Sequence, residues 1–452
     1  THGIAGIEVG SYGHRSVNTS LSHKTDKFDV MLSVQRVTED GFTTYAPNGE
    51  DIDQYEDDGY RNTTVNLQAA YWIDEHNRVE AGYHDINALN KYDGSIPVYP
   101  YTMDPNSIQR GDFRQRSGYL TYKYFITNHA IETTLSKSAF TKKELDTTWG
   151  LSDYKGEVPS IELKDTWKYY DNGTLVIGGS YEKRELTYTS VGEDEKERDE
   201  NSKALYLNNT NKFGNIVLIE ALRYDKFSAF DDKVTSKVGT KYLFSDQCNI
   251  YANYGTAYKT PTMFEMIYPW APGASNFDLK PENIKSFNAG MQYAGFNMNF
   301  FRNEIEDLIR YRTSKYVNID GTSVFKGIEL SYEHQLLNAL LMGANYTYVD
   351  AKDKDGNRLT DIPRYQSSLY ATYMPIKQIA WNMNGTYIGS RKDSSTEETG
   401  NYFVANTKVT YHATKDLDVY LKVNNLFDRY YQTVYGYASA ERNYYMGVEA
   451  RF

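Results

Sequence analysis

The chain contains 452 residues, carries a formal net charge of −11 and has a single cysteine. No apolar run approaches the roughly 20 residues of a membrane-spanning helix, which excludes a helical membrane protein, and the negative charge argues against a nucleic-acid partner. Cys248 cannot form an internal disulfide, and we interpret it as a structural residue.

The 43 tyrosines are the unusual feature of the composition. A tyrosine ring is apolar and its hydroxyl is wet, so this residue suits a girdle at a membrane–water interface. A polar average composition is compatible with a membrane barrel, because only alternate residues of its strands face lipid. A soluble, tyrosine-rich β protein of two or three domains is the alternative that composition leaves open.

The first residues already have the pattern of a barrel wall. In THGIAGIEVGSYG, residues 1–13, Ile7, Val9 and Ser11 alternate with Glu8 and Gly10. Alternation with a period of two indicates a strand with one apolar and one polar face.

Turn signals then recur along the whole chain. Long polar segments with Gly, Asp or Pro are predicted near 10–16, 40–60, 88–112, 141–155, 188–202, 225–235, 259–281, 312–323, 350–364, 389–401 and 430–442. Tight reversals are predicted near 23–28, 73–77, 126–129, 170–174, 211–215, 245–249, 294–297, 335–339, 375–379 and 414–417. Eleven long and ten short connections predict 22 strands.

The chain ends on a further strand with two distinct faces. In YYMGVEARF, residues 444–452, Tyr444, Met446, Val448, Ala450 and Phe452 point one way. A terminal strand that ends on an aromatic residue is typical of outer-membrane barrels, and such a sheet must close because lipid cannot satisfy an open edge. The predicted fold is all-β, a 22-stranded antiparallel transmembrane β-barrel with short periplasmic turns and long extracellular loops.

Acidic residues gather in two neighbouring outer loops. Asp51, Asp53, Glu56 and Asp58 lie in the loop near 40–60, and Asp93 and Asp104 flank the next long loop. Hard oxygen ligands that converge from two loops suit Ca²⁺. The alternative is a solvated acidic loop with no ion. Farther along, Arg110, Arg114 and Arg116 alternate on one strand, and we expect them to face the lumen.

Several segments resemble the TonB-dependent outer-membrane transporters. They include NYGTAYKTPTMFEMIYP (253–269), NFDLKPENIKSF (276–287), FFRNEIEDLI (300–309), FKGIELSYE (325–333), IPRYQSSLYATY (362–373) and NNLFDRYYQTVYGYASAERNYYMGVEARF (424–452), in the order and spacing of that family. Within the family, NLFDRYYQTVYGY and YGTAYKTP are most similar to the transporters of vitamin B12 (cobalamin). The resemblance implies a barrel that imports its ligand into a bacterium across the outer membrane.

The resemblance also implies a plug inside the lumen, which a TonB-type protein opens with the energy of the proton-motive force. Because residues 1–13 already have a wall pattern, we expect 1–452 to be the barrel domain alone, with no plug domain in this chain. The plug is then a separate polypeptide, a removed segment, or dispensable. The expected partners are outer-membrane lipid, the plug polypeptide, the TonB-type protein, the ligand and a surface lipoprotein.

The resemblance further implies where an ion and a ligand bind. YEDDGY (55–60) is similar to an acidic calcium motif of the cobalamin transporters, and Asp93 and Asp104 match the second loop with the family's spacing. Ligand contacts in the family come from outer loops and the plug. The aromatic candidates are Tyr99, Tyr101, Trp149, Tyr154, Tyr268 and Trp270, whose rings suit a broad corrinoid disc.

Other functions remain alternatives. A siderophore or haem receptor is the nearest, although the long loop at 259–281 contains no histidine to ligate haem. A plugless passive channel and a structural or adhesive barrel are the others. No metalloprotease, hydrolase or phosphate-loop motif is present, so we expect neither an enzyme nor a redox cofactor.

Overall fold

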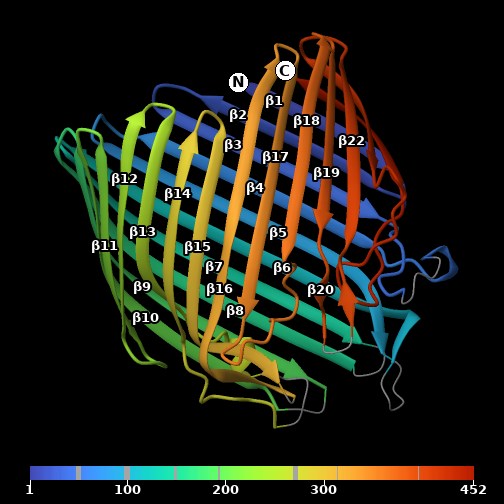
Figure 1. Cartoon of the computed structure of the whole chain (residues 1–452), viewed down its shortest axis with the longest axis horizontal. Coiled ribbons are helices and arrows are strands. Elements are labelled where there is room, and N and C mark those ends of the chain that lie inside the picture. The colour runs from blue at the N-terminus through green and yellow to red at the C-terminus, as the bar shows by residue number, and fades with distance from the viewer. Residues whose placement is uncertain are drawn as a thin grey trace.

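The computed structural model describes residues 1–46, 52–95, 102–146, 150–191, 194–267, 273–312, 314–394 and 397–452. Twenty-two antiparallel strands form one sheet that closes on itself, as the sequence predicts (Figure 1). No helix in the described part of the chain is long and apolar enough to cross a membrane.

The wall consists of strands that each pair with the next one along the chain. The strands are β1 (His2–Gly10), β2 (Arg15–Lys24), β3 (Phe28–Glu39), β4 (Tyr60–Trp72), β5 (Asn77–Ser95), β6 (Met103–Ile126), β7 (His129–Asp146), β8 (Gly150–Tyr170), β9 (Gly173–Ser190), β10 (Lys196–Phe213), β11 (Ile216–Phe227), β12 (Lys233–Ser245), β13 (Cys248–Lys259), β14 (Glu282–Tyr293), β15 (Phe296–Arg312), β16 (Lys315–Leu337), β17 (Leu340–Lys352), β18 (Tyr365–Ile376), β19 (Ile379–Ile388), β22 (Tyr402–His412), β23 (Leu417–Asn424) and β24 (Asn443–Arg451). The connection between β19 and β22 carries the small ribbon of β20 (Arg391–Lys392) and β21 (Glu398–Thr399).

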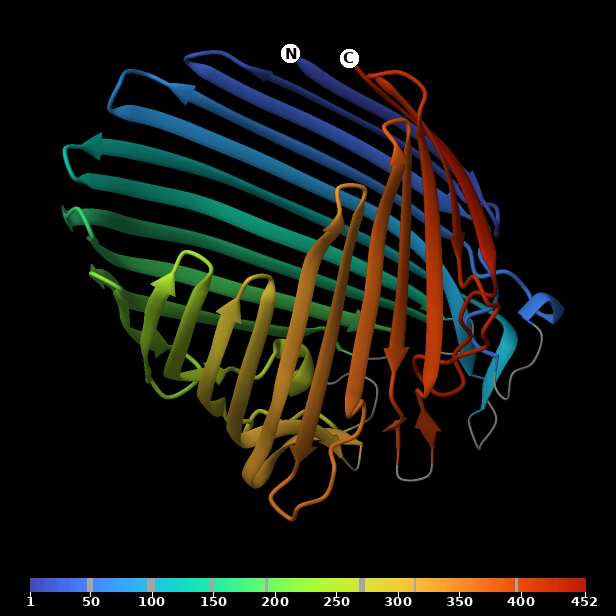
Figure 2. The ribbon, with the colours of Figure 1, turned by 45° about the horizontal axis from the view of Figure 1, so that its top comes forward.

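The first and last strands close the barrel. β1 pairs with β24, with Ile4 opposite Arg451 and Val9 opposite Met446. The terminal Phe452 continues this pairing through two backbone hydrogen bonds with Gly3, of 2.6 and 2.9 Å. Both termini therefore lie side by side at the end that carries the short turns (Figure 2). Closure leaves no unpaired sheet edge, which is the condition for a sheet in lipid.

All ten predicted tight reversals are turns between consecutive strands, and the predicted long segments join strands at the other end of the barrel. We call that other end the long-connection end. The lengths of several loops were predicted wrongly. Most of 141–155 and 312–323 is strand, because β7, β8, β15 and β16 extend far into these predicted loops. An antiparallel ribbon satisfies its own backbone outside the membrane, so it needs no apolar face there.

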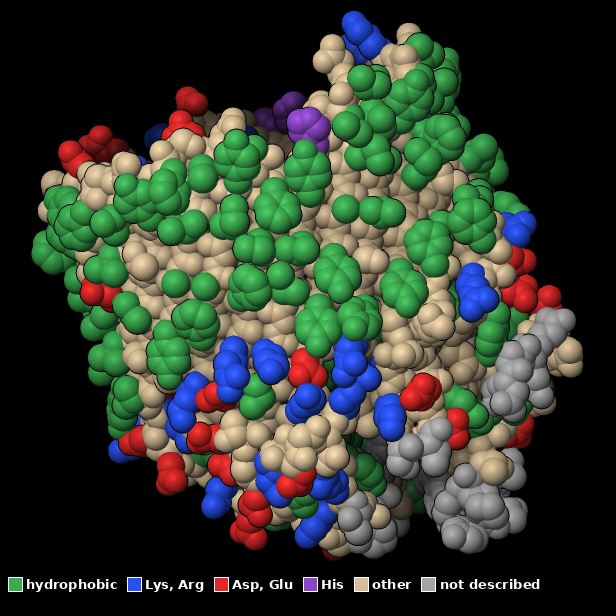
Figure 3. Space-filling model, viewed as in Figure 1, with side chains coloured by type: hydrophobic (Ala, Val, Ile, Leu, Met, Phe, Trp, Pro, Cys, Tyr) green, Lys and Arg blue, Asp and Glu red, His purple; other side chains and the backbone are tan. Residues whose placement is uncertain are grey.

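The outer face of the wall is an apolar belt. Large side chains exposed on it include Leu421 at 61% and Val17 at 57%. Figure 3 shows apolar side chains spread over the wall on the visible side, and Lys, Arg, Asp and Glu gathered below them at the long-connection end. This sorting of alternate residues is the pattern of a lipid-facing barrel.

The inner face is polar and carries a ladder of ion pairs near the short turns. Arg78 of β5 lies 3.3 Å from Asp29 of β3 and 2.8 Å from Glu80. Lys123 of β6 bridges Glu80 and Glu132 of β7 at 3.0 and 3.7 Å. Charged side chains in this number require a wet lumen or a polar occupant, since an apolar filling would leave them poorly solvated.

The three arginines of β6 do not face the lumen, contrary to expectation. Arg114 and Arg116 lie opposite Thr141 and Ala139 of β7, on the same outward face as Leu120 and Leu135. The guanidinium of Arg114 lies 2.8 Å from Asp85, also on the outer wall. The prediction failed because strand alternation alone does not say which of two polar-looking faces is inside.

Candidate metal centre between two loops

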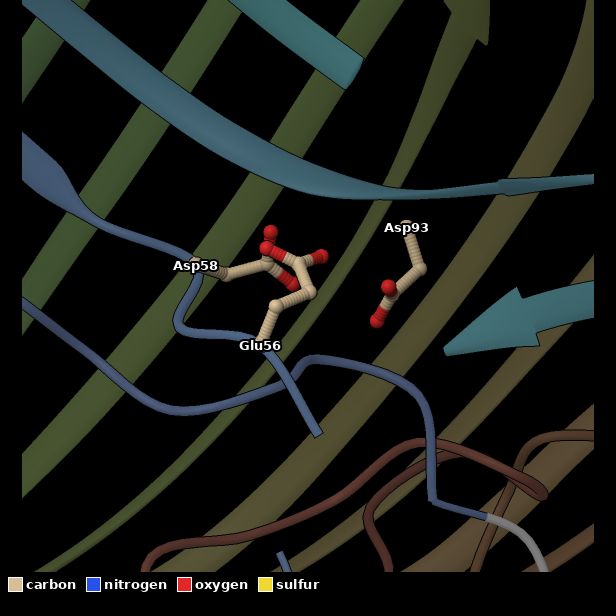
Figure 4. A group of neighbouring side chains, drawn as sticks. All are labelled: Glu56, Asp58 and Asp93. Carbon is tan, nitrogen blue, oxygen red and sulfur yellow. The ribbon is translucent and has the colours of Figure 1, made fainter. Parts of the chain in front are cut away.

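Three carboxyl groups meet at the long-connection end. Glu56 and Asp58 lie in the connection between β3 and β4, after a short 3-10 turn at Ile52–Gln54, and Asp93 lies near the end of β5. One oxygen from each lies within 4.8 Å of the others. Figure 4 shows Glu56 and Asp58 projecting from one loop toward the side chain of Asp93. The structure thus brings together three of the six residues that the sequence nominated as metal ligands.

Hydrogen bonds hold one oxygen of each aspartate. Oδ2 of Asp58 accepts a bond from the Thr44 backbone N–H at 2.8 Å and lies 2.7 Å from the Thr44 hydroxyl. Oδ2 of Asp93 accepts bonds from the Tyr45 N–H at 2.7 Å and the Thr43 hydroxyl at 3.0 Å. The Thr44 hydroxyl also lies 3.1 Å from that same Asp93 oxygen. These bonds fix the orientation of both carboxyl groups.

The other oxygens have no partner among the described residues. Asp58 is 6% exposed and Asp93 is 4% exposed. Oδ1 of each, and both carboxyl oxygens of Glu56, are buried without a hydrogen bond in this part of the chain. Burial of unpaired carboxylate oxygens is costly, and a cation that these oxygens ligate would remove that cost. Carboxylate oxygens are the ligands that Ca²⁺ prefers.

The electrostatics agree with a group of acids whose mutual repulsion and burial outweigh the attraction of Lys91. Burial, together with repulsion from Asp58 and Asp93, raises the pKa of Glu56 to about 7. Burial raises the pKa of Asp58 to about 6, although its hydrogen bonds with Thr44 oppose the shift. Like charges this close favour the protonated form unless a cation replaces the proton.

The remaining nominated ligands lie elsewhere. Asp53 is exposed on the 3-10 turn. Asp104 lies at the start of β6, where its Oδ1 accepts a hydrogen bond from the Asn106 N–H at 3.0 Å. Neither belongs to the three-carboxyl group, and Asp51 lies outside the described residues.

Backbone geometry explains why the loop brings Asp58 beside residues 43–45. Gly41 has φ +85°, and a Cβ there would lie 2.0 Å from the Asp58 carbonyl oxygen. Only glycine permits both the left-handed conformation and this close approach. The sequence pattern identified the acids but missed Gly41 and Thr44, because neither residue type is a typical metal ligand.

The last long connection, residues 425–442, anchors this loop. The Ala46 N–H donates to the Gly436 carbonyl at 2.9 Å, and the Ala438 N–H donates to the Thr44 carbonyl at 2.9 Å. The Gln432 amide donates to the Ala46 carbonyl at 3.2 Å. The loop that carries Glu56 and Asp58 is therefore tied to the seam where the barrel closes.

Of the aromatic residues nominated for ligand contact, only Tyr154 lies in the described chain. Tyr154 of β8 is 7% exposed and packs on Tyr188 of β9, with ring centroids 4.7 Å apart. It also faces Phe264 of α1 (Met263–Ile267) at 6.4 Å. Tyr154 thus lies against two other aromatic rings at the long-connection end. Tyr99, Tyr101, Trp149, Tyr268 and Trp270 lie outside the described residues.

That contact shows how the connection between β13 and β14 crosses the barrel. On one side Phe264 and Phe277 reach β8 and β10, where Arg198 lies 5.4 Å from the Phe277 ring. On the other side Met266 and Leu279 form a buried cluster with Ile309 of β15. Strands that are not neighbours in the sheet are thus linked across the long-connection end.

Comparison with known proteins places these features in a family. Residues 8–426 match the family model described as TonB dependent receptor-like, beta-barrel. Among curated relatives, the vitamin B12 transporters BtuB of Vibrio cholerae serotype O1, strains O395 and M66-2, are each 24% identical over 472 residues, covering 99% of this chain and 71% of theirs.

Solved structures share the fold. The ferric-catecholate import receptor Fiu from K12 E. coli, in its closed form, has a TM-score of 0.81 at 17% identity, covering 100% of this chain and 82% of that one. The ferric enterobactin receptor PfeA from Pseudomonas aeruginosa has a TM-score of 0.82 at 15% identity, with 100% and 80% covered. The copper transporter OprC has a TM-score of 0.84 at 15% identity, covering 100% of this chain and 80% of that one. At these identities the likeness concerns the fold alone.

Proposed function

The chain belongs to the TonB-dependent receptor β-barrel family, and from this premise we propose that it is the barrel of an outer-membrane transporter that imports cobalamin or a related corrinoid. Members of this family are outer-membrane proteins, and the named relatives are transporters and receptors rather than enzymes. The observation that carries the choice of ligand is the similarity to vitamin B12 transporters over 99% of the chain.

We propose that Ca²⁺ binds Glu56, Asp58 and Asp93 and joins the β3–β4 connection to the end of β5. The unpartnered buried oxygens of these three residues support the site. Ca²⁺ takes six to eight oxygens, so further ligands are needed, and Asp51, Asp53 and Asp104 are the other candidates that the sequence nominates. An ion that ties the two loops together reduces the entropy that ligand capture costs.

The proposed import cycle needs a plug and an energy source. A barrel of about 22 strands has a lumen too wide for its own side chains to fill. We propose that a plug, on whichever polypeptide it resides, fills this lumen and is displaced through a TonB-type protein. Aromatic side chains at the long-connection end are proposed to contact the ligand, namely Tyr99, Tyr101, Trp149, Tyr154, Tyr268 and Trp270.

A binding screen of the complete receptor tests the ligand. Cyanocobalamin, haem and a ferric catecholate siderophore are each titrated with and without Ca²⁺. We expect saturable corrinoid binding that Ca²⁺ strengthens. Saturable binding of haem or the siderophore, with none of cyanocobalamin, would replace the corrinoid by another cargo of the same family.

A conductance measurement tests active import against a passive channel. The complete receptor in planar bilayers is expected to show low conductance, because the plug blocks the lumen. A steady, large conductance together with an absence of corrinoid binding would contradict the transporter and support an open pore.

A further inference from the structure

Three arginines without a counter-charge cluster on the outer wall at β2, β3 and β4. Arg15 of β2, Arg36 of β3 and Arg61 of β4 are exposed, and within the described residues none of them has an ion pair or a hydrogen bond from its guanidinium group. They lie on the same outward face as Val17 and Val34, which are two residues away along β2 and β3. We call these three residues the arginine patch.

Strand register places the three guanidinium groups close together. Arg15 and Arg61 both lie directly opposite Thr38 of β3, one from each side. Arg36 lies two residues before Thr38 on the same face, opposite Val17 and Thr63. Neighbouring strands are about 4.8 Å apart, so the Cα atoms of Arg15 and Arg61 are separated by about 10 Å, with Arg36 diagonal to both.

No acid of β2, β3 or β4 lies on the same face as this patch. The acids of these three strands are Asp29 and Glu39, both of β3, and both have the parity of the inward face. Other cations of the outer wall have carboxylate partners, as for Lys137 with Glu157 at 2.5 Å and Arg302 with Glu304 at 2.8 Å. Three like charges at this spacing repel one another, so an external anion stabilises them.

The position of the patch indicates what that anion is. Arg15 and Arg61 each follow a connection at the long-connection end, and apolar pairs such as Val34 with Val65 and Leu32 with Leu67 continue from the patch into the belt. The guanidinium groups therefore lie at the boundary where lipid tails end and headgroups begin. Guanidinium groups bind phosphate oxygens in a bidentate manner and are only weakly hydrated.

We propose that the arginine patch binds the phosphate-bearing headgroup of a lipid in the leaflet that surrounds the long-connection end. The inference rests on the membrane placement of the barrel and not on its cargo. A lipid held at β2–β4 would also lie against the wall below the β3–β4 connection.

Native mass spectrometry of the full chain in a non-ionic detergent tests the proposal. The protein is titrated with lipid A that carries two phosphates and with lipid A from which both phosphates have been removed. We expect the phosphorylated lipid to bind at least tenfold more tightly. In R15Q/R36Q/R61Q that preference is expected to disappear.

The matched control is K137Q/K285Q/R302Q, which removes three outer-wall cations that already hold carboxylates. It is expected to bind the phosphorylated lipid within about twofold of the unaltered protein. Folding of each variant is checked by the shift in gel mobility on heating, and R15K/R36K/R61K, which keeps the charge, is expected to retain part of the preference.

Three results would overturn the proposal. They are unchanged lipid binding by the glutamine triple variant, equal loss in the control variant, and full displacement of the lipid by millimolar inorganic phosphate. The last result would make the site one for a free anion. Cobalamin binding can persist in every one of these outcomes, so failure here is separate from failure of the proposed import.

Discussion

At the scale of single residues, the unpartnered oxygens of Asp58 and Asp93 lead to the first prediction. Replacing either by Asn removes a charged ligand and leaves an amide of the same shape. Ca²⁺ affinity, measured by calorimetry on the purified barrel, is expected to fall by at least about tenfold in each variant. D57N is the matched control, because Asp57 is exposed in the same acidic loop. Equal losses in D57N and D58N would mean that only the net charge of the loop matters.

Protons are expected to compete with the ion. Since burial raises the pKa of Glu56 to about 7 and that of Asp58 to about 6, both groups are protonated in the ion-free protein below these values. Ca²⁺ affinity is therefore predicted to rise as the pH increases from 5.5 to 8. A flat affinity over this range would contradict the shared site.

The same shifts make a prediction about the ion-free loop. A folded state with raised carboxyl pKa values binds more protons than the unfolded chain, so its stability is greatest at low pH and falls as the pH rises toward 7. Limited proteolysis of the β3–β4 connection without Ca²⁺ is expected to be faster at pH 8 than at pH 5.5. Added Ca²⁺ is expected to abolish that difference, whereas D57N is expected to behave like the unaltered protein.

Residue types predicted part of this site. Of the five nominated acids that the structure describes, Glu56, Asp58 and Asp93 meet in space, whereas Asp53 and Asp104 do not join them. The sequence could not predict Thr44, whose hydroxyl lies between two carboxyl groups. Its role depends on the pairing of distant loops, which no local pattern encodes.

At the scale of elements, Gly41 controls how the β3–β4 connection folds. A Cβ at Gly41 would overlap the Asp58 carbonyl oxygen. G41A is therefore expected to loosen the loop and weaken Ca²⁺ binding by about tenfold or more, with the barrel intact by gel mobility. The matched control is G356A, at a glycine with φ +81° that has open space around it. If both variants bind Ca²⁺ equally well, the close approach at Gly41 has no role in the site.

The positions of elements were easier to predict than their lengths. Turn residues such as Asp171-Asn172 mark reversals locally, and each tight turn was placed correctly. Strand ends at the long-connection end were placed wrongly. A tilted strand needs only about 9–11 residues to cross a bilayer, but β6 runs for 24 residues and β16 for 23. Beyond the membrane the chain has no apolar alternation to signal a strand, and pairing with the neighbour alone extends it.

At the scale of the whole molecule, closure and sidedness follow from counting and alternation. A barrel with an even number of strands has both termini at the same end, which is here the short-turn end. The antiparallel pairing of β1 with β24 requires that even number. Alternation predicted that one face is apolar, but it could not place Arg114, because polar residues occur on both faces near the long-connection end. The charged ladder around Lys123 and the arginine patch lie on opposite faces of the same wall, and only the closed sheet tells them apart.

Two adjacent residues of β10 test this sorting directly. Leu207 is on the outward face, opposite Leu222 of β11, and Asn208 is on the inward face, opposite Ala221. An arginine on the lipid face near the bilayer midplane costs roughly 2–4 kcal/mol, whereas one in the lumen stays hydrated. L207R is therefore expected to unfold at lower urea concentration than the unaltered protein in phospholipid vesicles, as followed by gel mobility. N208R, which introduces the same side chain one residue later, is expected to unfold within about 0.5 kcal/mol of the unaltered protein. Equal sensitivity of the two variants would mean that the two faces of the wall meet the same solvent, and a lipid-embedded barrel would then be untenable.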